Sequence, residues 1–78
     1  MTDRIDILFG ENMQTLMSER GFSYRELSAL TGIGIASLHE YANAKTSVSL
    51  QYAKKISSAL GSTVDEMTEI KLVKKIAN

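Results

Sequence analysis

Cysteine, proline and tryptophan are all absent from this sequence of 78 residues. Without cysteine the chain has neither a disulfide framework nor a thiolate metal site, which fits a reducing compartment. No proline interrupts the helical patterns that cover almost the whole sequence. The length allows one domain with a small core, so we expect a modest stability that dimerisation would raise.

An excess of charge of either sign is also missing, because nine Lys and Arg residues balance nine Asp and Glu residues. The composition therefore lacks the basic excess that often accompanies nucleic-acid binding, and any attraction to phosphate must come from local placement. No apolar run approaches the roughly 20 residues that span a bilayer, and the N-terminal MTDRIDILFG does not resemble a signal peptide. We expect a soluble cytoplasmic protein that does not bind membranes.

The residue types needed for catalysis or metal binding are sparse. His39 is the only histidine and has no second ligand at metal-binding spacing, so we assign no metal. No pattern combines a nucleophile, a base and an oxyanion donor. We therefore expect neither an enzyme nor a cofactor, and no small-molecule ligand is evident.

The most informative segment runs from Ser23 to Asn43 and reads as two short helices joined by a glycine turn. Ser23 and Glu26 have the spacing of a capping box, which begins the first of these helices. Gly32 ends that helix with a left-handed turn, and Gly34 caps the next one. The expected inward side chains are Leu27, Leu30, Thr31, Leu38 and Tyr41. This is the pattern of a DNA-binding helix-turn-helix.

Three further helices are predicted around this motif. The first spans about 3–20, the fourth begins at the N-cap Ser49 and ends at Leu60, and the fifth begins at Thr63, which forms a capping box with Glu66. The side chains expected to face the core are Ile5, Leu8, Phe9, Met13, Leu16 and Met17 in the first helix, and Leu50, Ala53, Ile56 and Leu60 in the fourth. The sequence thus predicts an all-α, compact five-helix domain.

We expect residues 70–78 to form an amphipathic extension of the predicted domain, which covers residues 1–69. On a helical wheel, lysines and Asn78 lie opposite the apolar side chains of Ile70, Leu72, Val73, Ile76 and Ala77. A strand over 70–72 is an alternative to a helix, since that run is short and β-branched. The apolar side either forms a dimer contact or packs back onto its own chain.

The stretch from Phe9 to Met67 resembles the lambda-repressor/Cro-like (XRE-type) helix-turn-helix domains of phage and bacterial transcription regulators. The matching pieces are MSERGFSYRELSALTGI, LHEYANAK and SLQYAKKISSALGSTVDEM. The resemblance implies a recognition helix in the major groove of double-stranded DNA and a homodimer on a near-palindromic operator. By position it places Gly34, Ile35, Ala36, Ser37, His39, Glu40 and Asn43 at the DNA, and Tyr24, Arg25, Lys45 and Thr46 at its backbone.

Two positions depart from the family pattern. Met17 and Ala42 stand where members often pair an arginine with a glutamate, so we expect an apolar contact in place of the ion pair. Ala44 stands where a glycine usually follows the recognition helix. Because asparagine tolerates a left-handed conformation, we expect the turn to shift to Asn43.

The recognition helix itself begins with Ile35, Ala36 and Ser37, where relatives commonly present side chains that form paired hydrogen bonds with purines. Apolar side chains can instead contact thymine methyl groups. The expected function is that of a sequence-specific transcriptional regulator, either a repressor or a Cro-like switch. The alternative is a protein-interaction module on the same fold, such as an antirepressor or a partner subunit, with weak or no DNA binding.

Overall fold

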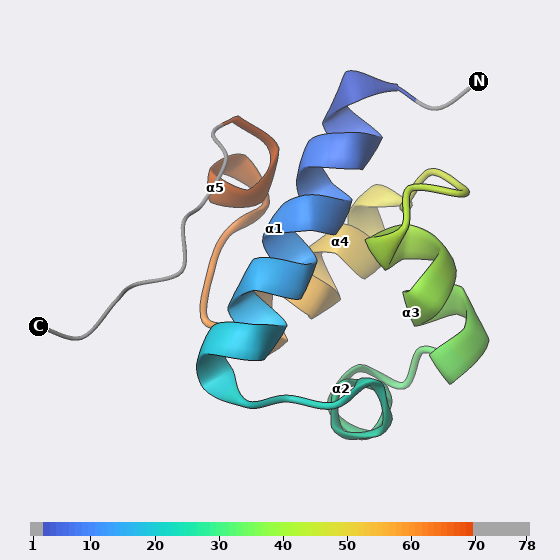
Figure 1. Ribbon diagram of the computed structural model, residues 1–78, viewed down its shortest axis with the longest axis vertical. Coiled ribbons are helices and arrows are strands. Elements are labelled where there is room, and N and C mark those ends of the chain that lie inside the picture. Colours follow the sequence, from blue (N-terminus) through green and yellow to red (C-terminus); the bar gives the residue numbers. More distant parts are fainter. Residues whose placement is uncertain (1–2, 70–78) are drawn as a thin grey trace, which may run out of the picture.

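The computed structural model describes residues 3–69, in which every regular element is a helix (Figure 1). The helices are α1 (Arg4–Arg20), α2 (Tyr24–Thr31), α3 (Ile35–Ala42), α4 (Leu50–Ala59) and α5 (Val64–Glu69). The predicted all-α, five-helix architecture is thereby confirmed. The predictions for residues 70–78, a helical or strand extension and a dimer contact, lie outside the described residues.

Helix α1 forms the centre of the domain, with α5 on one side and α3 on the other (Figure 1). Its N-cap is Asp3, and the side chains of Asp3 and Asp6 cap each other's backbone. It ends where Gly21 adopts a left-handed conformation with φ 72°. Helix α2 packs against α3 and α4, and α4 packs against α5, so that the five helices surround one core.

The capping box at the start of α2 is confirmed. The Ser23 hydroxyl accepts a hydrogen bond from the Glu26 N–H at 3.1 Å, and the Glu26 carboxylate accepts one from the Ser23 N–H at 3.0 Å. Gly32 ends α2 with φ 75°, and Gly34 is the N-cap of α3, both as predicted. The helix-turn-helix therefore has the boundaries that its capping residues indicate.

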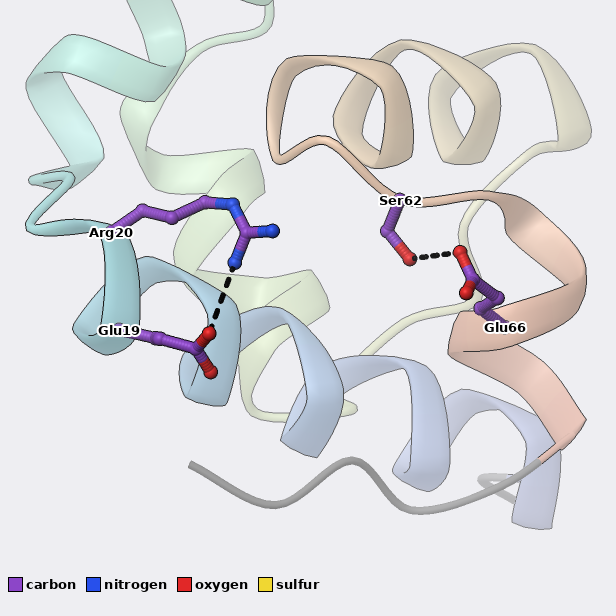
Figure 2. Close-up of polar contacts among 4 residues, drawn as sticks. All are labelled: Glu19, Arg20, Ser62 and Glu66. Carbon is purple, nitrogen blue, oxygen red and sulfur yellow. Dashed lines mark hydrogen bonds and ion pairs between the residues drawn. The ribbon is translucent and has the colours of Figure 1, made fainter. Parts of the chain in front are cut away.

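Helix α4 has Ser49 as its N-cap, as predicted, but it ends at Ala59, with Leu60 as its C-cap. At the next helix, the Thr63 hydroxyl accepts a hydrogen bond from the Glu66 N–H at 3.1 Å. The Glu66 carboxylate accepts a hydrogen bond from the Ser62 hydroxyl at 3.1 Å (Figure 2). It also accepts one from the Thr63 hydroxyl at 3.3 Å. The Thr63 half of the predicted capping box is thus present, and Glu66 also binds the turn that precedes α5.

The end of α1 lies beside this same turn. Arg20 forms an ion pair with Glu19 at 3.6 Å (Figure 2). A Cβ atom added to Gly61 would lie 3.5 Å from two nitrogen atoms of the Arg20 guanidinium, which shows how closely this side chain follows the turn. Gly61 itself has φ 71°, a conformation that favours glycine.

Most of the apolar side chains predicted to face inward lie in the core or at its edge, and three are exposed. The buried set is Phe9, Met13, Leu16, Met17, Leu27, Ile33, Leu38, Ala42, Ala53, Ile56, Leu60 and Met67. Leu8 and Tyr41 are half-buried. Ile5, Leu30 and Leu50 were expected to face inward, but they are 54%, 61% and 68% exposed.

The three exceptions share a geometric origin. Ile5 and Leu50 lie in the first turns of their helices, at the edge of the core, where few described residues cover them. In the eight-residue helix α2, Leu27 and Thr31 define the buried stripe. Leu30 points about 80° away from the centre of that stripe at 100° per residue.

Helix α5 is attached to the domain through buried polar groups. The Asn12 side chain, fully buried, donates a hydrogen bond to the Met67 carbonyl at 2.9 Å. The Ser57 hydroxyl lies 2.7 Å from the Ala53 carbonyl and 3.1 Å from the Met67 sulfur. Because buried polar groups are costly unless they are paired, these bonds fix α5 against α1 and α4.

Candidate nucleic-acid interface

The turn between α2 and α3 is held by two side-chain hydroxyls. The Ser28 hydroxyl donates to the Ile33 carbonyl at 2.6 Å. The Thr31 hydroxyl donates to the Leu27 carbonyl at 2.8 Å and accepts from the Ile33 N–H at 3.2 Å. These bonds satisfy backbone groups that the turn leaves without helical partners, so the angle between the two helices is well defined.

Helix α3 also rests directly on the backbone of α1. A Cβ atom added to Gly10 would lie 2.6 Å from the Ala42 carbonyl oxygen and 2.7 Å from that of Tyr41, which only glycine permits. The Gln14 side chain donates to the same Ala42 carbonyl at 2.6 Å. Sequence reasoning missed both contacts, although a glycine in the middle of a helix was their signal.

The replacement of the usual ion pair by Met17 and Ala42 agrees with this packing. Met17 and Ala42 are 5% and 3% exposed, and both belong to the apolar core where α1 meets α3. A lone charge at either position would be buried without a partner. Apolar side chains therefore suit both positions, and a direct contact between them stays a prediction.

The predicted shift of the turn after α3 is wrong. Asn43 has φ −99°, and the left-handed conformation falls on Ala44, with φ 56°. The Asn43 side chain donates to the His39 carbonyl at 2.8 Å, and the Lys45 N–H donates to the Glu40 carbonyl at 2.9 Å. These C-terminal bonds fix the chain path, so Ala44 takes the position that glycine usually fills.

Most of the side chains predicted to face DNA lie on the outer surface of the helix-turn-helix. Six of these residues are exposed, namely Arg25, Gly34, Ile35, Ala36, His39 and Glu40, whereas Tyr24 and Ser37 are half-buried. Ile35, at the first position of α3, leaves 41% of its surface in solvent. The exposed side of α3 thus begins with apolar atoms and continues with an imidazole and a carboxylate.

Tyr24 and His39 join the two helices on this surface. Their ring centroids are 3.8 Å apart, with an angle of 31° between the planes. Burial raises the pKa of the Tyr24 hydroxyl, because desolvation disfavours the phenolate. The hydroxyl therefore stays protonated at neutral pH and can donate a hydrogen bond to an anion such as phosphate.

The remaining predicted residues follow the C-terminal end of α3. Asn43, Lys45 and Thr46 are all exposed. The Asn43 amide is already bonded within the protein, whereas the side chains of Lys45 and Thr46 extend from the loop between α3 and α4.

Within residues 3–69, no group of three or more His, Cys, Asp or Glu side chains is arranged to hold a metal ion. In the same range, no helix has the length and hydropathy needed to cross a membrane.

Comparison with solved structures identifies the fold. The clp gene regulator ClgR from Corynebacterium glutamicum matches with a TM-score of 0.78 and 19% identity, over 86% of this chain and 71% of ClgR. A second ClgR structure gives 0.76 and 20%, over 83% and 84%. The restriction-modification controller protein C.AhdI from Aeromonas hydrophila gives 0.74 and 24%, over 80% and 94%.

Sequence comparison supplies the family. No curated protein matches the chain. The model of the helix-turn-helix family HTH_3, however, matches residues 13–67. This range includes the turn, the Ser28 and Thr31 hydroxyls that hold it and all the residues predicted to face DNA. The chain therefore belongs to the XRE-type helix-turn-helix family of DNA-binding transcription regulators.

Proposed function

We propose that this regulator acts as a homodimer that inserts one α3 helix per subunit into the major groove of a near-palindromic operator. The observation that carries this proposal is the exposed side of α3, which is supported from behind by Gly10 and Gln14. A rigid support matters because base contacts require the helix to keep one position in the groove. Occupying the operator then blocks polymerase, as in a repressor or a Cro-like switch.

Contacts to the DNA backbone come from both ends of the motif. Arg25 and Lys45 supply positive charge, and the Tyr24 hydroxyl supplies a hydrogen-bond donor. Thr46 adds a hydroxyl beside Lys45. Such groups fix the register of the protein on the duplex, whereas side chains of α3 contact the bases.

The case for a dimer comes from the small size of the domain. One module this small touches too few base pairs to select a site, whereas two half-sites about one helical turn apart double the contacts. The similar structures are those of a gene regulator and of a restriction-modification controller protein, which supports a role in gene regulation. If the target is bacterial or phage DNA, the protein would act in the cytoplasm.

The sharpest test is the salt dependence of binding to duplex selected from random sequences. Because few cations flank the helix-turn-helix, we expect the logarithm of affinity to fall with the logarithm of salt concentration with a slope of about 3 to 5 per dimer. Arg25→Ala and Lys45→Ala should each reduce that slope. Lys55→Ala is the matched control, because Lys55 is an exposed cation on α4, outside the motif, and its loss should leave the slope nearly unchanged.

The second candidate function is a protein-interaction module, which is favoured by the exposed Ile35 and by Ala36 beside it. Apolar side chains at the centre of a surface are typical of protein contacts. Footprinting at low salt separates the two functions. If no duplex is protected while circular dichroism shows a folded protein, DNA recognition is refuted and the interaction module takes its place.

A further inference from the structure

A shallow groove lies where α1, α4 and α5 meet. Its volume is about 200 Å³, and its apolar lining consists of Ile5, Phe9, Val48, Leu50, Ala53 and Val64. Because an apolar cavity of ~150 Å³ takes up a molecule the size of benzene, this groove has room for a large aliphatic side chain. The recognition surface of α3 contributes no residue to it.

The rim of the groove is apolar and uncovered by the described residues. Ile5 is 54% exposed and Leu50 is 68% exposed, so that two large aliphatic side chains flank the opening. The sequence pattern predicts that both Ile5 and Leu50 are buried. A face that the sequence marks as interior but residues 3–69 leave open calls for an additional covering segment.

The end of the described chain is attached at this groove. Thr68 lines the groove, and Glu69 is the last described residue of α5. Nine residues follow, at positions 70–78, which is enough chain to extend about 30 Å. Tethering of this kind gives a segment a high effective concentration at a site next to its attachment point.

The sequence of residues 70–78 suits the groove in pattern and in charge. Leu72 and Ile76 follow Val64 and Thr68 at intervals of four residues, which is the spacing of one side of a helix. The segment contains three lysines and no acidic residue. The groove offers the carboxylate of Asp6, which lies on its wall.

We propose that residues 70–78 cover this groove on their own chain, with Leu72 and Ile76 as the apolar contacts and lysines at the outer edge of the segment, within reach of Asp6. The segment thereby completes the core at Ile5 and Leu50. Of the two roles that its apolar side permits, packing back onto the same subunit is the one that the attachment point favours. This inference does not depend on DNA binding.

Paramagnetic relaxation enhancement tests the proposal in the full-length protein. Because the chain contains no cysteine, Asn78→Cys provides a single attachment point for a nitroxide outside the apolar row. In a sample of spin-labelled, ¹⁵N-labelled chains diluted into unlabelled wild type, we expect the amide signals of Ile5 and Leu50 to be broadened. The amide of Ile35, on the recognition helix, should be unaffected.

A substitution on the groove rim provides the specificity control. Leu50→Glu should abolish the broadening at Ile5, because it places a charge on the apolar rim. Gln51→Glu is the matched variant, since Gln51 is the exposed neighbour of Leu50 and makes no part of the groove wall. It should preserve the broadening. Both positions are exposed, so both variants should fold, which circular dichroism checks.

Two outcomes would overturn the proposal. Broadening of Ile5 that occurs only when spin-labelled chains without ¹⁵N are mixed with ¹⁵N-labelled wild type would assign the groove to a second copy. Equal broadening at Ile5 and Ile35, or none at either position, would show that the segment does not occupy the groove. Since no DNA is present, neither outcome bears on the proposed recognition of an operator.

Discussion

Ala44 adopts a conformation that its side chain disfavours. Among residues 3–69, it is the one residue other than glycine with positive φ, at 56°. A left-handed conformation costs an L-residue with a Cβ atom roughly 1–2 kcal/mol. Glycine removes this cost, but its greater freedom in the unfolded chain offsets part of the gain in stability. Ala44→Gly should therefore raise the free energy of unfolding by about 0.5–1 kcal/mol in a denaturant titration. Asn43→Gly, at a residue with φ −99°, is the control and should not stabilise the protein.

Ile35 is the residue that distinguishes this recognition surface most clearly. Its exposed aliphatic side chain cannot form a hydrogen bond with a base, but it can remove a thymine methyl group from water, which contributes somewhat under ~1 kcal/mol. Replacing a contacted thymine by deoxyuracil should weaken binding several-fold, and Ile35→Ala should reduce that difference. If uracil substitution leaves the affinity of the wild type unchanged throughout the selected site, specificity must come from His39, Glu40 or DNA shape.

At the scale of helices, the contact between α1 and α3 reverses the usual effect of a glycine substitution. Alanine is a better helix former than glycine by roughly 1 kcal/mol, so Gly10→Ala would stabilise an isolated α1. In the protein its methyl group would collide with two backbone carbonyls of α3, at 2.6 and 2.7 Å. We expect a net destabilisation of about 1–2 kcal/mol, together with weaker operator binding. An unchanged or higher melting temperature would show that the helices separate without cost.

The same helix pair offers a test of coupling between Met17 and Ala42. Ala42→Glu buries an unpaired carboxylate and should destabilise the fold by roughly 3 kcal/mol, because Ala42 is only 3% exposed. Adding Met17→Arg should recover part of this loss if the two side chains meet. Denaturant titrations of the single and double variants measure the coupling. Strictly additive losses would place the two side chains out of contact.

Capping residues explain why the helices could be predicted so well from the sequence. Ser23, Gly32, Gly34 and Ser49 act within a few residues of their own position, and each begins or ends a helix as expected. The left-handed turn at Ala44 could not be predicted in this way. Its location depends on bonds that the Asn43 side chain and the Lys45 N–H form with the preceding helix, which override the preference of asparagine.

Burial and the supports of the site were harder to predict than the helices. Periodicity gives the side of a helix that faces inward, but it does not tell where the covering elements end, and so Ile5 and Leu50 were placed in the core. Gln14 is exposed and polar, and only the tertiary structure brings it to the Ala42 carbonyl. The positions predicted to face DNA came from the family resemblance, and the residues that support α3 from behind came from the structure.

For the whole molecule, the proposed dimer implies a particular geometry on DNA. Two α3 helices in successive major grooves on one side of the duplex require half-site centres about 10 base pairs apart. Inserting five base pairs between the half-sites should turn them to opposite sides and reduce affinity to that of a single half-site. Inserting ten should restore part of it only if the subunits can separate. Gel-shift titrations on these three duplexes measure the effect, and equal affinities would contradict a rigid dimer.

The sulfur atom of Met67 has a consequence for how the protein responds to oxidants. The side chain is fully buried, and its sulfur lies 3.1 Å from the Ser57 hydroxyl. With no cysteine in the chain, peroxide can attack only methionine sulfur among the thiol and thioether groups. Oxidation of Met67 must therefore wait until α5 detaches from the core. The rate at which its sulfoxide forms therefore reports the fraction of molecules in which α5 is detached. A sulfoxide formed in this way would prevent α5 from packing against the core again.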